Sequence, residues 1–159
     1  MRSIRRRIPT KLYRSIHRVL PIVCVDLVVS DPQRKNFLLV KRKNQPERGK
    51  WYLLGGRIFK NERLASAARR KLKGEIGLRG KIVTQLGIHE YFSKTGYFPG
   101  TNSHTIIVVF LAVVRPHANS VKLDSQSSDL RWFRRIDPGW HPYVKKFLKC
   151  AGFQEKTRA

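Results

Sequence analysis

The sequence predicts a single α/β domain, and three observations carry that prediction. Short aliphatic runs typical of buried strands alternate with amphipathic segments typical of helices. The 159 residues suffice for one hydrophobic core, and a hydrophobic content of 41% with 10% aromatics excludes a disordered chain. No apolar run approaches the roughly 20 residues of a membrane-spanning helix, so we expect no membrane partner.

The first part of the chain is expected to form a basic helix and two strands. Residues 8–20 carry apolar side chains at every fourth position, and Pro21 ends that helix. Residues 22–30 form an aliphatic run typical of a buried strand, with Asp26 as its one charged residue. A buried acid is costly unless paired, so Asp26 is expected to form a salt bridge or to face a polar cleft. Residues 36–43 return as a second strand.

A central helix is expected between residue 64 and Gly77, shortly after a Gly-Gly pair. Four apolar side chains recur four apart and form one face of this helix: Leu64, Ala68, Leu72 and Ile76. Gly77 suits the left-handed conformation that closes many helices, so the helix should end there.

The second part of the chain alternates strands with turns and closes on a helix. The expected strands are residues 81–92, 105–114 and 129–133, and the expected helix is residues 142–150. The run 105–114 is the richest in β-branched residues and should be a central strand. We therefore divide the chain into a basic N-terminal segment (1–20), one domain (21–153) and a tail expected to fray (154–159).

The formal net charge of +24 allows two interpretations. A basic protein attracts phosphate-bearing partners, so the charge could mark weak, non-specific binding of nucleic acid. The charge is spread along most of the chain, however, and no RNA-recognition signature accompanies it, which favours a generally basic surface. Cys24 and Cys150 show the spacing of neither a metal site nor a disulfide framework, which favours a reducing cytoplasm.

The stretch from Gly55 to Leu78 carries a long motif and has the sequence GGRIFKNERLASAARRKLKGEIGL. It resembles the motif of the Nudix hydrolases, G-x(5)-E-x(7)-R-E-U-x-E-E-x-G-U, in which U is a bulky aliphatic residue. The matching positions are Gly56, Glu62, Arg70, Leu72, Glu75, Gly77 and Leu78. Lys71 and Gly74 stand where the family usually has Glu. The resemblance implies a Nudix-type αβα sandwich around a mixed β-sheet, which the alternation of elements supports.

Within that family the chain is similar to the GDP-mannose mannosyl hydrolase branch, over roughly residues 20–135. The shared segments include LPIVCVDLVV, FPGTNSH and KLDSQSSDLRWF. The resemblance implies hydrolysis of a nucleoside diphosphate sugar, GDP-mannose-like, or a related nucleoside diphosphate, by an enzyme often found as a homodimer. The alternative is a degenerate Nudix domain that binds nucleotide or nucleic acid without hydrolysis.

The motif helix also predicts how many divalent metal ions the protein binds. Helix positions 71, 74 and 75 project together, and three carboxylates there would hold several divalent cations. With one carboxylate left, a single Mg²⁺ or Mn²⁺ is expected, and the resemblance implies that the Gly55 carbonyl, Glu75 and Gln126 bind it. The alternative for Glu75 is a salt bridge with a nearby Lys or Arg. Lys71 either stands in for a second cation or points to solvent.

The resemblance assigns further side chains to the substrate. Arg42 and Arg57 would hold the diphosphate, while Asp26 and Tyr91 would contact the sugar. The other motif residues are expected to be structural, namely Gly56, Glu62, Arg70 and Gly77. Of these, Glu62 and Arg70 are expected to form an orienting ion pair.

The general base has no assignment from the sequence. The branch has a His directly after the ligand Gln, whereas this chain has Ser127, and a serine cannot take a proton from water near neutral pH without help. The weak candidates are Glu90, Asp129 and His104. Glu90 and Asp129 could equally pair with neighbouring arginines, and His104 could be an ordinary hydrogen-bonded residue.

Overall fold

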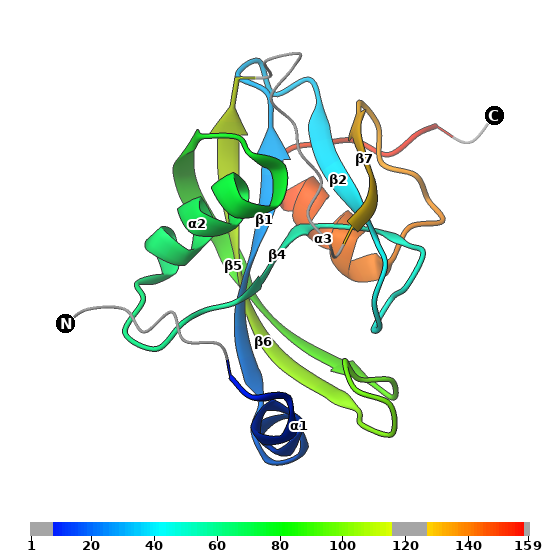
Figure 1. The fold of residues 1–159 in the computed structure, drawn as a ribbon. Coiled ribbons are helices and arrows are strands. Elements are labelled where there is room, and N and C mark those ends of the chain that lie inside the picture. Colours follow the sequence, from blue (N-terminus) through cyan, green and yellow to red (C-terminus); the bar gives the residue numbers. More distant parts are fainter. Residues whose placement is uncertain (1–7, 116–126, 158–159) are drawn as a thin grey trace.

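A computed structural model describes residues 8–115 and 127–157 of the chain. The helices are α1 (Thr10–Val19), α2 (Leu64–Ile76) and α3 (Pro142–Cys150). The strands are β1 (Ile22–Ser30), β2 (Phe37–Arg42), β3 (Trp51–Tyr52), β4 (Leu54–Arg57), β5 (Gly80–Ser93), β6 (Ser103–Val114) and β7 (Ser127–Phe133). Within the described residues the strands form one seven-stranded sheet of order β3-β2-β1-β6-β5, with β4 paired to β1 and β7 to β2 (Figure 1).

Strand β1 is the centre of the sheet, and it changes partners along its length. One edge runs parallel to β6 from Ile22 to Ser30. On the other edge, residues 24–27 pair antiparallel with β4, whereas residues 29–30 pair antiparallel with β2. Strands β4 and β2 diverge where β1 changes from one to the other, between residues 27 and 29. The sheet therefore forks at this point, close to Asp26.

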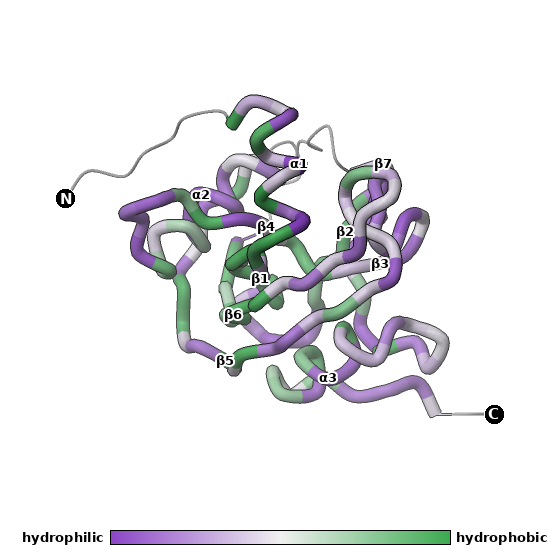
Figure 2. Tube along the Cα trace, turned by 90° about the horizontal axis from the view of Figure 1, so that it is seen from below, coloured by the Kyte–Doolittle hydropathy of each residue, from purple (hydrophilic) through white to green (hydrophobic). Residues whose placement is uncertain are grey.

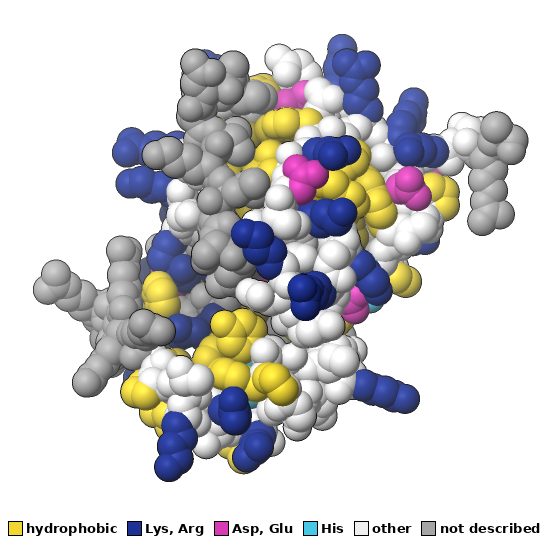
Figure 3. All heavy atoms as spheres, turned by 45° about the vertical axis from the view of Figure 1, so that its right-hand side comes forward, with side chains coloured by type: hydrophobic (Ala, Val, Ile, Leu, Met, Phe, Trp, Pro, Cys, Tyr) yellow, Lys and Arg dark blue, Asp and Glu magenta, His cyan; other side chains and the backbone are white. Residues whose placement is uncertain are grey.

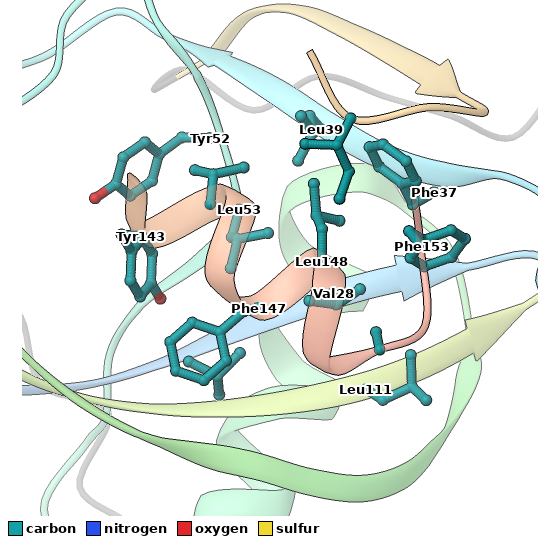
Figure 4. Packing of buried hydrophobic residues seen from close by; sticks show 14 of the residues in the cluster. Val28, Phe37, Leu39, Tyr52, Leu53, Leu111, Tyr143, Phe147, Leu148 and Phe153 are labelled. Carbon is teal, nitrogen blue, oxygen red and sulfur yellow. The ribbon is translucent and has the colours of Figure 1, made fainter. Parts of the chain in front are cut away.

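The two faces of the sheet carry separate hydrophobic clusters, which makes the fold the predicted αβα sandwich. Alternate side chains of β1 and β6 point to opposite faces, as the pleat requires. Helix α2 covers one face with the apolar stripe that the sequence predicted, and Gly77 ends it in the left-handed conformation at φ 73°. Helix α3 covers the other face through Val144, Phe147 and Leu148. Figure 4 shows the last two within this cluster.

Helix α1 lies at the end of the sheet where β1 begins (Figures 1 and 2), and aromatic side chains make its inward contacts. Leu12 belongs to the aliphatic repeat but is 54% exposed. The rings of Tyr13 and His17 pack instead against Phe98, with centroids 5.7 Å and 5.4 Å away. Aromatic edge-to-face contacts with the β5–β6 loop therefore orient this helix, and the aliphatic spacing does not.

The end of the chain also differs from expectation. The predicted frayed tail begins at Gln154, yet the Ile136 amide donates to the Gln154 carbonyl at 2.9 Å and the Lys156 amide donates to the Ile136 carbonyl at 2.9 Å. These bonds attach the tail to the fully buried Ile136. Fraying was expected because chain termini fray unless they are tied down, and backbone hydrogen bonds tie down residues 154–156 here.

The described surface is basic and carries scattered acids. On the face in Figure 3, lysines and arginines are spread over several elements, with few acidic side chains among them. No helix in residues 8–115 and 127–157 is long and apolar enough to cross a membrane.

Candidate active site

A cavity of about 330 Å³ lies at the fork of the sheet, and α1, α2 and the β2–β3 loop contribute to its walls. Four of its side chains are cationic, namely Arg42, Arg57, Arg70 and Lys71, of which Arg70 is paired with Glu62. The rest of the wall mixes aromatic, aliphatic and polar side chains, with acids at Asp26 and Glu47. Cavities of this size and mixed character are typical of small-molecule sites.

Asp26 is the buried acid of this cavity. It lies opposite Gly55 in the β1–β4 pairing, and the Tyr143 hydroxyl donates a hydrogen bond of 2.7 Å to its Oδ2. Burial raises the pKa of Asp26 to about 7, against the hydrogen bond from Tyr143 and the charges of Arg42 and Lys71, which lower it. Of the two sequence alternatives, the polar cleft is the one observed, and the carboxyl group exchanges a proton near neutral pH.

The Gly-Gly pair makes room for two of the cavity's side chains. A Cβ on Gly55 would lie 2.1 Å from Asp26 Oδ1 and 2.3 Å from the Val25 carbonyl oxygen. A Cβ on Gly56 would lie 2.6 Å from Lys71 Nζ, and the φ of 145° there is also one that side chains disfavour. The pair is therefore needed for Asp26 and Lys71 to reach the cavity.

The two predicted arginines reach the cavity from different strands. Arg42, at the end of β2, donates from Nε to the Pro46 carbonyl at 2.8 Å and lies over the Tyr52 ring at 5.4 Å. Arg57, at the end of β4, lies over the rings of Tyr13 and Phe59 at 5.4 Å and 5.1 Å. Aromatic stacking orients both guanidinium groups at the cavity, and the guanidinium group is well suited to bind a phosphate.

Tyr91 lines the cavity as well, and its hydroxyl group is hydrogen-bonded to Glu47. Its hydroxyl donates 2.9 Å to Glu47 Oε1, and Glu47 follows Pro46 in the β2–β3 loop. Burial raises the pKa of Tyr91 to about 12, with the bond to Glu47 in the same direction. The Tyr91–Glu47 pair therefore presents one neutral and one anionic group to a ligand.

The three expected metal ligands are not assembled in the described part of the chain. Gln126 lies outside the described residues. Glu75 Oε1 is 2.8 Å from Lys71 Nζ, so Lys71 points at the expected ligand and not at solvent. No group of three His, Cys, Asp or Glu side chains within residues 8–115 and 127–157 could hold a metal. As they stand, the described residues do not fit a resident divalent ion.

Glu62 and Arg70 form the orienting ion pair that the sequence predicted. Arg70 donates from Nε to Glu62 Oε1 and from a terminal nitrogen to Oε2, both at 2.7 Å. Glu62 Oε2 also accepts from the Phe59 amide at 3.0 Å, and Arg70 lies over the Phe59 ring at 4.0 Å. This bidentate pair fixes the loop between β4 and α2, and hence the approach of Lys71 to the Gly-Gly pair.

None of the three candidate bases is among the residues that line the cavity. Glu90 precedes Tyr91 in β5, and neighbouring strand residues point to opposite faces, so Tyr91 faces the cavity while Glu90 faces away. Glu90 Oε1 lies 3.4 Å from His104 Nε2. Asp129 pairs with Arg131 at 3.2 Å. Ser127 is buried at the start of β7 and does not line the cavity either.

Sequence reasoning missed several residues of the site. Tyr13 and His17 line the cavity from α1, and their spacing of four residues on a helix was a usable signal. Glu47 and Tyr143 carried no such signal. Tyr143 is 117 residues from Asp26 in the sequence, so only the fold brings them together.

Comparisons with known proteins show the family and the fold of this chain. A family model described as the NUDIX domain matches residues 20–149. The low-salt glycan biosynthesis protein Agl8 of Haloferax volcanii is 35% identical over 142 residues, which cover 89% of each protein. The ADP-ribose pyrophosphatase of Methanocaldococcus jannaschii is 34% identical over 91 residues, 57% of this chain and 50% of that protein. A crystal structure of a MutT NUDIX hydrolase from Burkholderia pseudomallei matches with a TM-score of 0.64 at 22% identity, covering 81% of this chain and 96% of the other.

Proposed function

The chain belongs to the NUDIX family and is a Nudix hydrolase, and from this premise we propose that its substrate is a nucleoside diphosphate sugar, with GDP-mannose as the model compound. The single observation that carries the proposal is that one cavity is lined by both cationic side chains and hydrogen-bond acceptors. Arg42, Arg57 and Lys71 supply positive charge for a diphosphate, while Asp26 and the Tyr91–Glu47 pair supply acceptors for hydroxyl groups. Acceptors beside a cationic wall suit a sugar attached to a diphosphate.

The relative from Haloferax volcanii supports the sugar half of this proposal. Its name places it in glycan biosynthesis, and it aligns with this chain over most of both sequences. The relative from Methanocaldococcus jannaschii is named for ADP-ribose, which is itself a nucleoside diphosphate joined to a sugar. Both names are consistent with one substrate class, although they differ in base and sugar.

Each group then has a task in hydrolysis. Arg42, Arg57 and Lys71 balance the charge of the diphosphate as it leaves. Asp26 accepts the proton of the attacking water or of a sugar hydroxyl, because a buried carboxyl group with a pKa near neutral is suited to general-base work. This assignment replaces the three candidate bases that do not line the cavity. Aromatic rings that line the cavity, such as Tyr13, are suited to stack on the nucleobase of the substrate.

A substrate screen tests the proposal. Purified protein is incubated with GDP-mannose, other nucleoside diphosphate sugars, ADP-ribose and 8-oxo-dGDP, each with Mg²⁺, with Mn²⁺ and with a chelator. Turnover of a sugar nucleotide in ¹⁸O-water supports the proposal, and the labelled product shows whether carbon or phosphorus is attacked. Binding of sugar nucleotides without product under every condition would contradict it and favour a binding domain.

A further inference from the structure

The side chain of Lys71 occupies the place where the family motif leads one to expect a metal ion. It lies one helical turn before Glu75 on α2, and its Nζ is 2.8 Å from Glu75 Oε1. Both side chains are largely shielded, with 16% and 12% of their surface exposed. A solvated surface pair would be more exposed, so this is a shielded ion pair, and its Lys71 member lines the cavity.

The ammonium group also lies against the turn whose carbonyl was expected to bind the metal. Its Nζ would be 2.6 Å from a Cβ on Gly56, which follows the expected ligand Gly55 directly. The ammonium group therefore shares both the carboxylate and the glycine turn with the expected ion.

The electrostatics of the cavity favour the ammonium group over a divalent cation. Nudix hydrolases generally use divalent metal ions, and Mg²⁺ binds best to several oxygen ligands in an octahedron. Of the expected ligands, the described residues offer the Glu75 carboxylate, which Lys71 engages, and the Gly55 carbonyl, and Arg42 and Arg57 line the same cavity. A divalent ion would have to displace Lys71 from Glu75 and then lie near three positive side chains, and like charges at short range repel strongly away from bulk water.

We propose that the Lys71 ammonium group is the resident cation of this site, so that protein side chains, and not a divalent ion, neutralise the substrate diphosphate. The proposal rests on the proposed function for its substrate. Glu75 is then a positioning residue, because it holds the ammonium group against the Gly-Gly pair without contacting substrate. Lys71 and the two arginines together supply the positive charge that a diphosphate requires as it leaves.

The test measures Mn²⁺ binding by electron paramagnetic resonance, with no nucleotide present. The variants are Lys71→Glu, which restores an acid at the position where the motif has one, and Lys71→Met, which removes the charge at similar length. Lys73→Glu is the matched control, since it makes the same charge change at an exposed position of α2. We expect no saturable Mn²⁺ binding by the wild type or by Lys73→Glu, and binding at least about tenfold tighter in Lys71→Glu.

Hydrolysis of GDP-mannose in a chelator is the second measurement. We expect the wild type and Lys73→Glu to keep their activity in the chelator, and Lys71→Met to lose about 100-fold. Tight Mn²⁺ binding by the wild type, or loss of its activity in the chelator, would overturn the proposal. If no variant hydrolyses any sugar nucleotide under any condition, the proposed function fails, while the Mn²⁺ measurement still decides what occupies the site.

Discussion

Strand β1 leads to two buried acids whose surroundings differ sharply. Asp26 is 7% exposed and Asp31, directly after the strand, is 6% exposed. Asp31 accepts hydrogen bonds at Oδ1 from the amides of Lys35 at 2.8 Å and Asn36 at 3.2 Å, and at Oδ2 from the Asn36 side chain. Asp26 accepts its hydrogen bond from the hydroxyl of Tyr143.

The pKa values of the two acids shift in opposite directions for that reason. Burial acts to raise both. At Asp31 the donors of the turn outweigh burial and lower the pKa, whereas at Asp26 burial dominates and raises the pKa to about 7. An acid whose charge is fully supported by donors serves the structure, while an acid that the fold leaves poorly supported is available for chemistry. Burial alone does not separate the two kinds.

The largest expected effect is on catalysis, in Asp26→Asn. The substitution keeps the volume and removes the proton acceptor, so we expect kcat/KM for a sugar nucleotide to fall by about 100-fold or more. The free energy of unfolding should stay the same or rise, because the buried charge is removed. Steady-state kinetics and urea unfolding give both quantities, with Asp31→Asn as the matched change at the other acid. If both variants kept full activity, the distinction between the two acids would be wrong.

The next effect is on stability, in Asp31→Ala. Removing this carboxylate leaves the amides of Lys35 and Asn36 without their acceptor, and we expect the free energy of unfolding to fall by about 2 kcal/mol at neutral pH. Because the pKa of Asp31 is lowered in the folded state, its contribution is present above the ordinary Asp pKa and is lost as pH falls through the folded value.

Urea unfolding at neutral and acidic pH measures this effect. The difference between Asp31→Ala and the wild type should shrink in acid. Asp137→Ala is the control, since Asp137 caps an exposed turn through the Gly139 amide and should matter less. Equal losses in the two variants, or a difference that grows in acid, would contradict the structural role of Asp31.

The sequence predicted those parts of the fold that short-range pattern determines. Strands β1 and β6 follow from aliphatic and β-branched runs, α2 from its four-residue repeat, and its end from Gly77, because each signal lies within the element itself. The αβα arrangement followed from a family resemblance carried by a contiguous motif. Helix α1 was predicted as a helix, but its inward face was not, since that face depends on a loop between β5 and β6.

The site was predicted only in part, for the same reason. Arg42, Arg57 and Tyr91 were named through the resemblance, and the structure brings them to one cavity with Asp26. The support of Asp26 by Tyr143 depends on a contact across most of the chain, which no local pattern records. Lys71 is a different case, because its spacing of four from Glu75 already favoured an ion pair on one helix face.

The smallest expected effect is that of Tyr143→Phe, which removes the hydrogen bond from Tyr143 to Asp26. The hydroxyl of Tyr143 donates to the Asp26 carboxylate and so lowers the pKa that burial raises. Without it the charged form loses a hydrogen bond, so the pKa of Asp26 should rise above about 7 and stability should fall by about 1 kcal/mol. Since hydrolysis requires the carboxylate, the acid limb of the pH–rate profile should move to higher pH, with activity recovering in mild alkali. Tyr91→Phe is the matched control, because that hydroxyl donates to Glu47. An acid limb that stays in place in Tyr143→Phe would mean that Asp26 does not titrate in catalysis, and the two buried acids would then differ in surroundings but not in role.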